Sequence, residues 1–171
     1  MTISNVILVL TTTCTALMAG LFYSYSYSVV PGLKSLNDAE YIASMQSINK
    51  AIQNPVFFIC FFGAPLLLPV STYLNYFQHP PLRFWLLLAA TFLYLIGVFG
   101  VTIFGNIPLN NMLEKFNLLN ASKDSISLQR TLFERRWNNL NTIRTLSSIL
   151  SLVLIIIACI NSDKNHLTFP E

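Results

Sequence analysis

LNTIRTLSSILSLVLIIIACI, residues 140–160, is the stretch that decides the fold. It has the length of about 20 residues that a helix needs to cross a bilayer. Its apolar part is preceded by Asn141, Thr142 and Arg144, so the run begins with hydrogen-bonding and charged groups. The stretch therefore predicts a membrane-spanning helix that carries polar side chains at membrane depth.

The composition of the whole chain also points to lipid as the surrounding solvent. Hydrophobic residues make up 54% and charged residues 10%, against roughly 45–50% and about 25% in a soluble domain. A length of 171 residues suits one unit, and we expect a single membrane domain over residues 1–171. The net charge of +3 is scattered along the chain, so a nucleic-acid partner is not expected.

Three further apolar segments are long enough to span a bilayer. With residues 140–160 they predict an all-α integral membrane four-helix bundle, and they cover residues 3–30, 56–77 and 82–104. A short turn with one histidine and two prolines at residues 79–81 makes the second and third helices antiparallel neighbours. The first segment has no basic residue ahead of it, which favours a retained helix over a cleaved signal peptide.

The orientation is predicted from the lysine and arginine residues between the spans. Most of them lie in the two long connections, at Lys34, Lys50, Lys115, Lys123, Arg130, Arg135 and Arg136. Only Arg83 and Lys164 fall on the opposite side. By the positive-inside rule, the loops at residues 31–55 and 105–139 face the cytoplasm and both termini lie outside. A bacterial inner membrane is the expected location.

The first of these loops contains the pattern of an extra amphipathic cytoplasmic helix. Asn37 and Glu40 have the spacing of a capping box. Apolar residues then recur at helical spacing, at Tyr41, Met45, Ile48 and Ile52. The helix should end before Asn54, because a residue that precedes a proline disfavours the α region. The second loop is expected to hold a helical run into Trp137 after a less ordered part near residues 120–125.

Polar side chains at membrane depth are the candidate functional residues, because hydrocarbon penalises each unsatisfied polar group by several kcal/mol. Asn138, Asn141 and Thr145 follow one another at intervals of three and four residues, and Trp137, Asn141 and Arg144 form an overlapping stripe, so all of them share one broad helix face. Arg144 lies about one turn inside the cytoplasmic edge. It either snorkels to the headgroups, with Trp137 as an interfacial anchor, or serves a site.

Two other helices carry polar or aromatic groups at the same level. The third helix ends in GNIPLNN, which supplies Asn106, Asn110 and Asn111. The first helix ends in a tyrosine-rich run in which Tyr23 and Tyr27 share a face. An interfacial tyrosine belt explains that run taken alone. Together, the three helix ends predict an inner-leaflet pocket with the long loops as a lid.

Runs spread over most of the chain resemble the anthrone oxygenase family of small four-helix membrane proteins, long known as a domain of unknown function. They are residues 19–23, 30–33, 45–49, 54–55 and 107–111, followed by Trp137, Asn138, Asn141, Arg144 and Thr145. Named members of that family are fungal enzymes that oxidise anthrones to anthraquinones with O2 and no obvious cofactor. Most bacterial members have no assigned substrate.

The resemblance implies an oxidation that passes through an extended oxyanion. Arg144 would stabilise the anion, and Asn141, Asn138 and Asn110 would orient carbonyl and phenol oxygens. Aromatic rings would stack on a flat substrate. The implied catalytic residues are Arg144, Asn141 and Asn110, and the implied substrate-binding residues are Trp137, Asn138, Asn111, Asn106, Tyr23, Phe22 and Asn54. The expected ligand is a hydrophobic small molecule or lipid, without a metal or cofactor.

The proton acceptor is the missing part of this chemistry. In the family that the chain resembles, many members carry a histidine directly after the asparagine that Asn141 matches, and this chain has Thr142 there. No histidine or carboxylate lies inside a predicted span, which leaves Glu134 at the edge or a tyrosine. The alternative function is therefore a non-catalytic membrane protein that binds a lipid, a quinone or another hydrophobic small molecule, or steadies a partner.

The remaining small and sulfur-containing residues point to packing. The three cysteines lie in apolar stretches without a CxxC pair, so neither a disulfide framework nor a redox motif is expected. Gly20, and Gly97 with Gly100, allow close helix contacts within the bundle or between copies of the chain. A homo-oligomer is accordingly one of the candidate assemblies.

Overall fold

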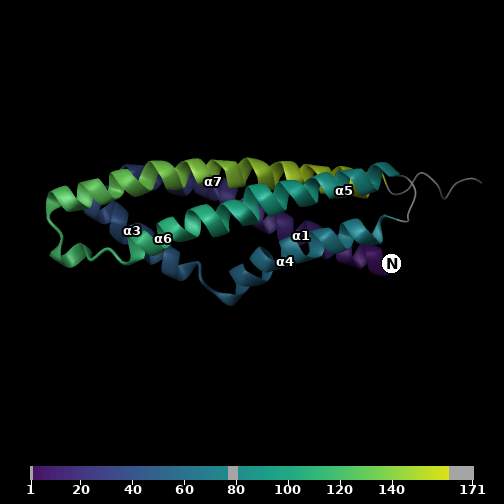
Figure 1. Cartoon of the computed structure of the whole chain (residues 1–171), viewed down its shortest axis with the longest axis horizontal. Helices are drawn as coiled ribbons and strands as arrows, with labels where there is room; N and C mark the ends of the chain where they lie inside the picture. Colours follow the sequence, from purple (N-terminus) through teal and green to yellow (C-terminus); the bar gives the residue numbers. More distant parts are fainter. Residues whose placement is uncertain (1, 77–80, 162–171) are drawn as a thin grey trace, which may run out of the picture.

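Four long helical rods run side by side in an elongated bundle (Figure 1). A computed structural model describes residues 2–76 and 81–161 of the chain. The four rods are long and apolar enough to cross a membrane and cover Ile3–Lys34, Pro55–Leu74, Leu82–Glu114 and Lys123–Ile160. The described residues contain no strand. The predicted all-α integral membrane four-helix bundle is confirmed.

Each rod is one helix or several helical segments joined end to end. The first rod comprises α1 (Ile3–Ser24), the π-helical segment η1 (Tyr25–Val29) and α2 (Val30–Lys34). The second is α4 (Pro55–Leu74). The third comprises α5 (Pro81–Tyr94), the π-helical segments η2 (Leu95–Gly100) and η3 (Thr102–Asn106), and α6 (Ile107–Glu114). The fourth is α7 (Lys123–Ile160); α3 (Asp38–Ala51) and the short 3-10 segment η4 (Leu118–Asn120) lie in the connections.

The helices continue beyond the predicted spans. Much of the segment at residues 105–139 is helical, because α6 continues to Glu114 and α7 begins at Lys123, and this includes the expected helical run into Trp137. Ser122 is the N-cap of α7, and its hydroxyl accepts a hydrogen bond from the Ser125 N–H at 3.3 Å. The less ordered part expected near residues 120–125 is therefore shorter, because polar residues at a capped helix start favour a helix as readily as a loop.

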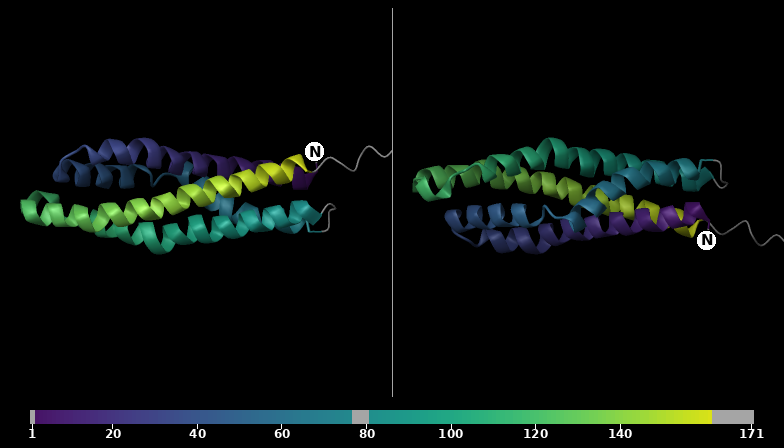
Figure 2. Two further views of the ribbon diagram at one scale, coloured as in Figure 1. Left: turned by 90° about the horizontal axis from the view of Figure 1, so that it is seen from above. Right: turned by 90° about the horizontal axis from the view of Figure 1, so that it is seen from below.

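The predicted helix in the first loop is α3, and it extends the bundle. The Asn37 side chain accepts from the Glu40 N–H at 3.0 Å, and the Glu40 carboxylate accepts from the Asn37 N–H at 3.3 Å, which is the expected capping box. Figure 2 shows α3 lying along the amino-terminal half of α7. Tyr41, Ile42 and Met45 are buried in that contact.

Arg130 on α7 ties this end of the bundle together. Its guanidinium forms ion pairs with Asp38 at 3.0 Å and Glu134 at 2.8 Å. It also donates to the carbonyl oxygens of Lys34 and Leu36 at 3.2 and 2.8 Å. These contacts join the end of the first rod to the start of the fourth, so α3 is held against α7.

At the other end of the bundle the helices are joined by small polar side chains. Thr11 and Ser71 share a hydrogen bond of 2.7 Å, and the Ser151 hydroxyl donates to the Ala90 carbonyl oxygen at 3.0 Å. The start of α1 and the end of α7 both lie here (Figure 1). The first and last described residues, Thr2 and Asn161, therefore lie at the same end of the bundle. The predicted turn at residues 79–81 falls mainly outside the described residues.

Candidate functional site

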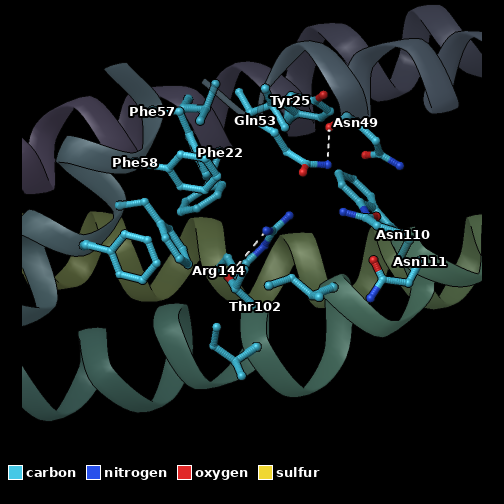
Figure 3. Close-up of a pocket in the computed structure, with 17 residues that line it drawn as sticks. Phe22, Tyr25, Asn49, Gln53, Phe57, Phe58, Thr102, Asn110, Asn111 and Arg144 are labelled. Atoms are coloured by element: carbon cyan, nitrogen blue, oxygen red, sulfur yellow. Dashed lines mark hydrogen bonds between the residues drawn. The ribbon is translucent and has the colours of Figure 1, made fainter. Parts of the chain in front are cut away.

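A cavity of about 220 Å³ lies inside the bundle. It is lined by residues of all four rods and of α3 with the turn that follows it. Its walls are largely apolar and aromatic, and its polar groups come from different helices. Figure 3 shows Arg144 rising from α7, with Phe22, Phe57 and Phe58 on one side and Asn110 and Asn111 on the other. A pocket with apolar walls and few converging polar groups is the usual form of a small-molecule site.

Arg144 is the charged group of the cavity. Its side chain is 6% exposed, and its guanidinium lies over the rings of Phe22 and Trp137, at 4.5 and 5.3 Å from their centroids. Its Nη1 is 3.5 Å from the Thr102 hydroxyl, and its Nε has no hydrogen-bond partner. The ion pairs among the described residues are those of Arg130, so no described carboxylate neutralises Arg144.

Asn141 lies behind the cavity and holds the guanidinium in place. Its Oδ1 accepts from Arg144 Nη2 at 2.8 Å, and its Nδ2 donates to the Ser26 hydroxyl at 2.9 Å. Ser26 in turn shares a hydrogen bond of 2.8 Å with Thr145. Because η1 and α7 meet through these bonds, the direction of the Arg144 side chain depends on both helices.

The polar ends of the third and fourth rods also meet, as the sequence predicted. The Trp137 indole N–H donates to Asn110 Oδ1 at 2.8 Å. Asn106 is buried, and its amide lies 3.4 Å from the Trp137 carbonyl oxygen. Asn111 lines the cavity next to Asn110. The orientation of the Trp137 indole ring is therefore fixed by its hydrogen bond to α6 of the third rod.

The structure brings five of the predicted site residues to the cavity wall: Phe22, Asn110, Asn111, Trp137 and Arg144. It places Asn106 and Asn141 directly behind them. It does not bring Tyr23, Asn138 or Asn54 to the cavity. Tyr23 is 52% exposed and packs on Tyr27 with ring centroids 4.6 Å apart. Asn54 is the N-cap of α4 and accepts from the Phe57 N–H at 3.0 Å.

Several wall residues were missed by the sequence analysis. They are Leu21, Tyr25, Asn49, Ile52, Gln53, Phe57, Phe58, Phe61, Phe62, Thr102, Ile103 and Ile107. The four phenylalanines form the visible pattern FFICFF, in which residues three and four apart share a helix face. Tyr25, Thr102 and Ile103 lie in π-helical segments, which are common at functional sites but change the spacing that a sequence pattern assumes.

The structure places Glu134 and Thr142 outside the wall of the cavity. Glu134 pairs with Arg130 at 2.8 Å and is not among the residues that line the cavity. Thr142 is exposed, and its hydroxyl donates to the Asn138 carbonyl oxygen at 3.0 Å, so its position also lies outside the cavity wall. Within the described ranges no three His, Cys, Asp or Glu side chains gather as a metal site would require.

Fold and site together define a four-helix integral membrane protein with an aromatic cavity around a buried arginine. A family model described as anthrone oxygenase matches residues 57–154, more than half of the chain. The protein therefore belongs to the anthrone oxygenase family. The matched region includes Asn110, Trp137 and Arg144 but begins after α1, so Phe22 lies outside it. Searches of curated proteins and of solved structures found no match.

Proposed function

We propose that this protein is an anthrone oxygenase-like enzyme that oxidises a planar, enolisable, hydrophobic substrate with O2 in the cavity around Arg144, without a cofactor. The observation that carries this proposal is the state of Arg144: it is buried, it has an unpartnered Nε, and no described carboxylate pairs with it. An arginine remains charged in proteins. The cavity therefore holds a cation that lacks an anionic partner.

Such a cation is unfavourable until something neutralises it. A charged side chain at membrane depth costs about 2.5–3.5 kcal/mol or more, and such residues usually line a functional pathway or site. Cation–π contacts to Phe22 and Trp137 offset part of that cost. An anionic ligand, or a ligand that becomes anionic during a reaction, would offset the rest.

The walls favour a flat and largely apolar ligand. The rings of Phe57 and Phe61 are stacked, with centroids 5.2 Å apart and an interplanar angle of 16°. Trp137 faces the cavity from α7 with its indole N–H already bonded to Asn110. Stacked aromatic walls suit a fused-ring substrate. The amides of Asn110 and Asn111 offer hydrogen bonds to its oxygen atoms.

The chemistry follows from the charge that the substrate develops. Loss of a proton from a CH2 group that is conjugated with a ketone through aromatic rings places negative charge on the carbonyl oxygen, where the Arg144 guanidinium can stabilise it. The carbanion then bonds to O2, and protonation gives a hydroperoxide. Loss of the second C–H proton and cleavage of the O–O bond release water and leave a new carbonyl. One O2 is consumed and one water is formed for each quinone.

We place the cavity in the inner leaflet of a bacterial inner membrane, with both termini outside. Lys34, Arg135 and Arg136 lie at the α3 end of the bundle, and clustered basic residues favour the cytoplasmic side. The cavity adjoins that end of the bundle, because Asn49 near the end of α3 and Ile52 and Gln53 just after it line the cavity. A hydrophobic substrate would then reach the site from the bilayer.

The test is O2 uptake together with anthraquinone absorbance, using purified, metal-analysed protein and an anthrone as the substrate. Wild type should accelerate quinone formation above the spontaneous rate, and heat-killed protein should not. Arg144→Lys should fold and lose activity, since a point charge replaces a planar fork of donors. Arg135→Lys, the same change at an exposed position, is the matched control. If wild type matches the background rate, the cavity belongs to a binding protein without this oxidation.

A further inference from the structure

Tyr25 is the second titratable side chain in the wall of the cavity. Among the lining residues, only Arg144 and Tyr25 carry groups that titrate. The proposed oxidation has to remove a proton from carbon, and a guanidinium cannot accept one because it already carries its full complement. A phenolate can accept a proton. This reaction therefore directs attention to the Tyr25 hydroxyl.

Tyr25 also separates the cavity from a second hollow on the outside. That hollow lies between η1 and α3 and is lined by Tyr25, Val29, Ile48, Ala51 and Ile52. Tyr25 and Ile52 line both spaces. The Tyr25 side chain therefore lies between the cavity and the outer hollow. Neither hollow is lined by any other titratable side chain among the described residues.

Helical spacing explains why Tyr25 lies on a different face from its neighbours in the tyrosine run. Tyr23 and Tyr27 are four residues apart and share a face, and they pair with each other on the outer surface. Tyr25 is two residues from each of them and lies on the opposite face, where its ring packs on Trp137 with centroids 5.5 Å apart. Tyr25 also opens the π-helical segment η1, and π-helical segments are common at functional sites.

Tyr25 and Arg144 both line the cavity and both lie against Trp137: the Tyr25 ring centroid is 5.5 Å and the Arg144 guanidinium carbon 5.3 Å from the centroid of the Trp137 ring. A phenolate beside a guanidinium forms an ion pair in which each charge stabilises the other. Arg144 has no anionic partner among the described residues. It can therefore stabilise a Tyr25 phenolate when the phenol loses its proton, and the substrate anion takes over the role of the phenolate once the substrate proton has moved.

We infer that Tyr25 is the proton-transferring residue of the proposed reaction, so this inference rests on the proposed function. The Tyr25 phenolate takes a proton from the substrate CH2, whose electron pair remains on the substrate as the oxyanion beside Arg144. After the carbanion bonds to O2, the Tyr25 phenol returns that proton and forms the hydroperoxide. The phenolate then takes the second C–H proton while the O–O bond breaks, and the departing hydroxide leaves as water with that proton.

The experiment compares Tyr25→Phe with Tyr27→Phe, the same change at an exposed tyrosine of the same run. Anthrone binding is measured by quenching of tryptophan fluorescence, and anion formation by absorbance in the absence of O2. Tyr25→Phe should bind anthrone within about twofold of wild type but form the anion and the quinone at least about a hundredfold more slowly. Tyr27→Phe should match wild type in all three measurements.

The pH profile separates proton transfer from a role in packing. Wild-type turnover should rise with pH as Tyr25 ionises, and this rise should vanish in Tyr25→Phe. Tyr25→His restores a proton acceptor and should recover part of the turnover, with a rise at lower pH. This second variant also decides the question if Tyr25→Phe does not fold.

The possible outcomes distinguish a failure of the proposed function from a failure of the role of Tyr25. If wild type forms quinone and Tyr25→Phe does so at the same rate, Tyr25 is not the proton acceptor and the proposed function stands. If wild type neither ionises nor oxidises the anthrone, both the function and the role of Tyr25 are overturned. If Tyr25→His matches Tyr25→Phe while both bind anthrone normally, the inference is likewise overturned.

Discussion

Arg144 and Asn141 lie one turn apart on α7, and the guanidinium Nη2 donates to the Asn141 Oδ1 at 2.8 Å. Asn141 also donates to Ser26 on η1. The charge of the cavity is therefore fixed in direction by an amide that is itself held by another helix. A buried cation in a fixed direction is the kind of preorganised group that stabilises charge developing on a substrate.

Asn141→Ala should reduce both activity and stability. It leaves the Arg144 Nη2 without its Asn141 partner and removes one of the two partners of the Ser26 hydroxyl, which should lower the free energy of unfolding by about 1–3 kcal/mol. Quinone formation should fall at least about tenfold, because the guanidinium is free to turn. Thermal unfolding in detergent and O2 uptake measure the two effects. Asn139→Ala, at an exposed position on the same helix, should change neither.

Trp137→Phe should weaken anthrone binding with little effect on folding. The change keeps an aromatic ring but removes the indole N–H that donates to Asn110 at 2.8 Å. The lost hydrogen bond should destabilise the protein by about 0.5–1.5 kcal/mol, and the untethered Asn110 should raise the KM for anthrone. Trp85→Phe removes an exposed indole as the control. Equal KM values for the two variants would contradict a role of Trp137 in the site.

Gly97→Ala should disrupt the contact between the third and fourth rods. A Cβ at this position would overlap the Ser147 hydroxyl and lie 2.6 Å from Ser147 Cβ. Overpacking of this kind costs about 1–3 kcal/mol, and the thermal midpoint should fall. Gly20→Ala meets nothing within 4 Å and should be neutral or slightly stabilising. Adding Ser147→Gly to Gly97→Ala should recover part of the loss, and no recovery would point to another cause.

The free energy of unfolding should fall in alkaline solution because of the Tyr41 hydroxyl, which lies outside the membrane-spanning helices. Burial raises the pKa of the Tyr41 hydroxyl above its ordinary value of 10; Glu134 raises the pKa further, and Arg130 partly opposes this. Because the pKa of Tyr41 is higher in the folded state than in the unfolded state, its contribution to the free energy of unfolding is complete below about pH 10. Above that pH the free energy of unfolding falls by up to about 1.4 kcal/mol per pH unit.

Tyr41→Phe removes the ionisable hydroxyl and should make unfolding less dependent on pH between about pH 10 and 12. Chemical unfolding of the two proteins at neutral and alkaline pH measures the difference. Tyr27→Phe, which removes an exposed hydroxyl, is the control and should behave as wild type does. An identical alkaline loss in Tyr41→Phe would rule out the buried Tyr41 hydroxyl as its source.

The helical architecture was predictable because its causes are local. Apolar runs of about 20 residues must form helices in lipid, where every backbone group needs an internal partner. The capping box of Asn37 and Glu40 is likewise a contact between residues three apart, and it lies where the sequence placed it. The helix ends at Glu114 and Lys123 were not predictable from hydropathy, since helices that leave the membrane are polar.

The site was predictable only in part. Arg144, Trp137 and Asn110 were recognised because a polar or charged group at membrane depth is unusual wherever it occurs. Tyr23 and Tyr25 lie on opposite faces of the helix, and the packing of the first rod against α7 decided which face meets the cavity. The pattern of the tyrosine run does not record that packing between distant segments.

The sequence alone determined that the chain spans a membrane with four helices and carries a charged residue inside one of them. Only the tertiary structure decided what surrounds that charge: Phe22 and Ser26 from the first rod, the phenylalanines of α4, and Asn110 from α6. Helices form through contacts a few residues apart, which sequence patterns record. A cavity forms through packing between distant segments, and no local pattern records which side chains will meet there.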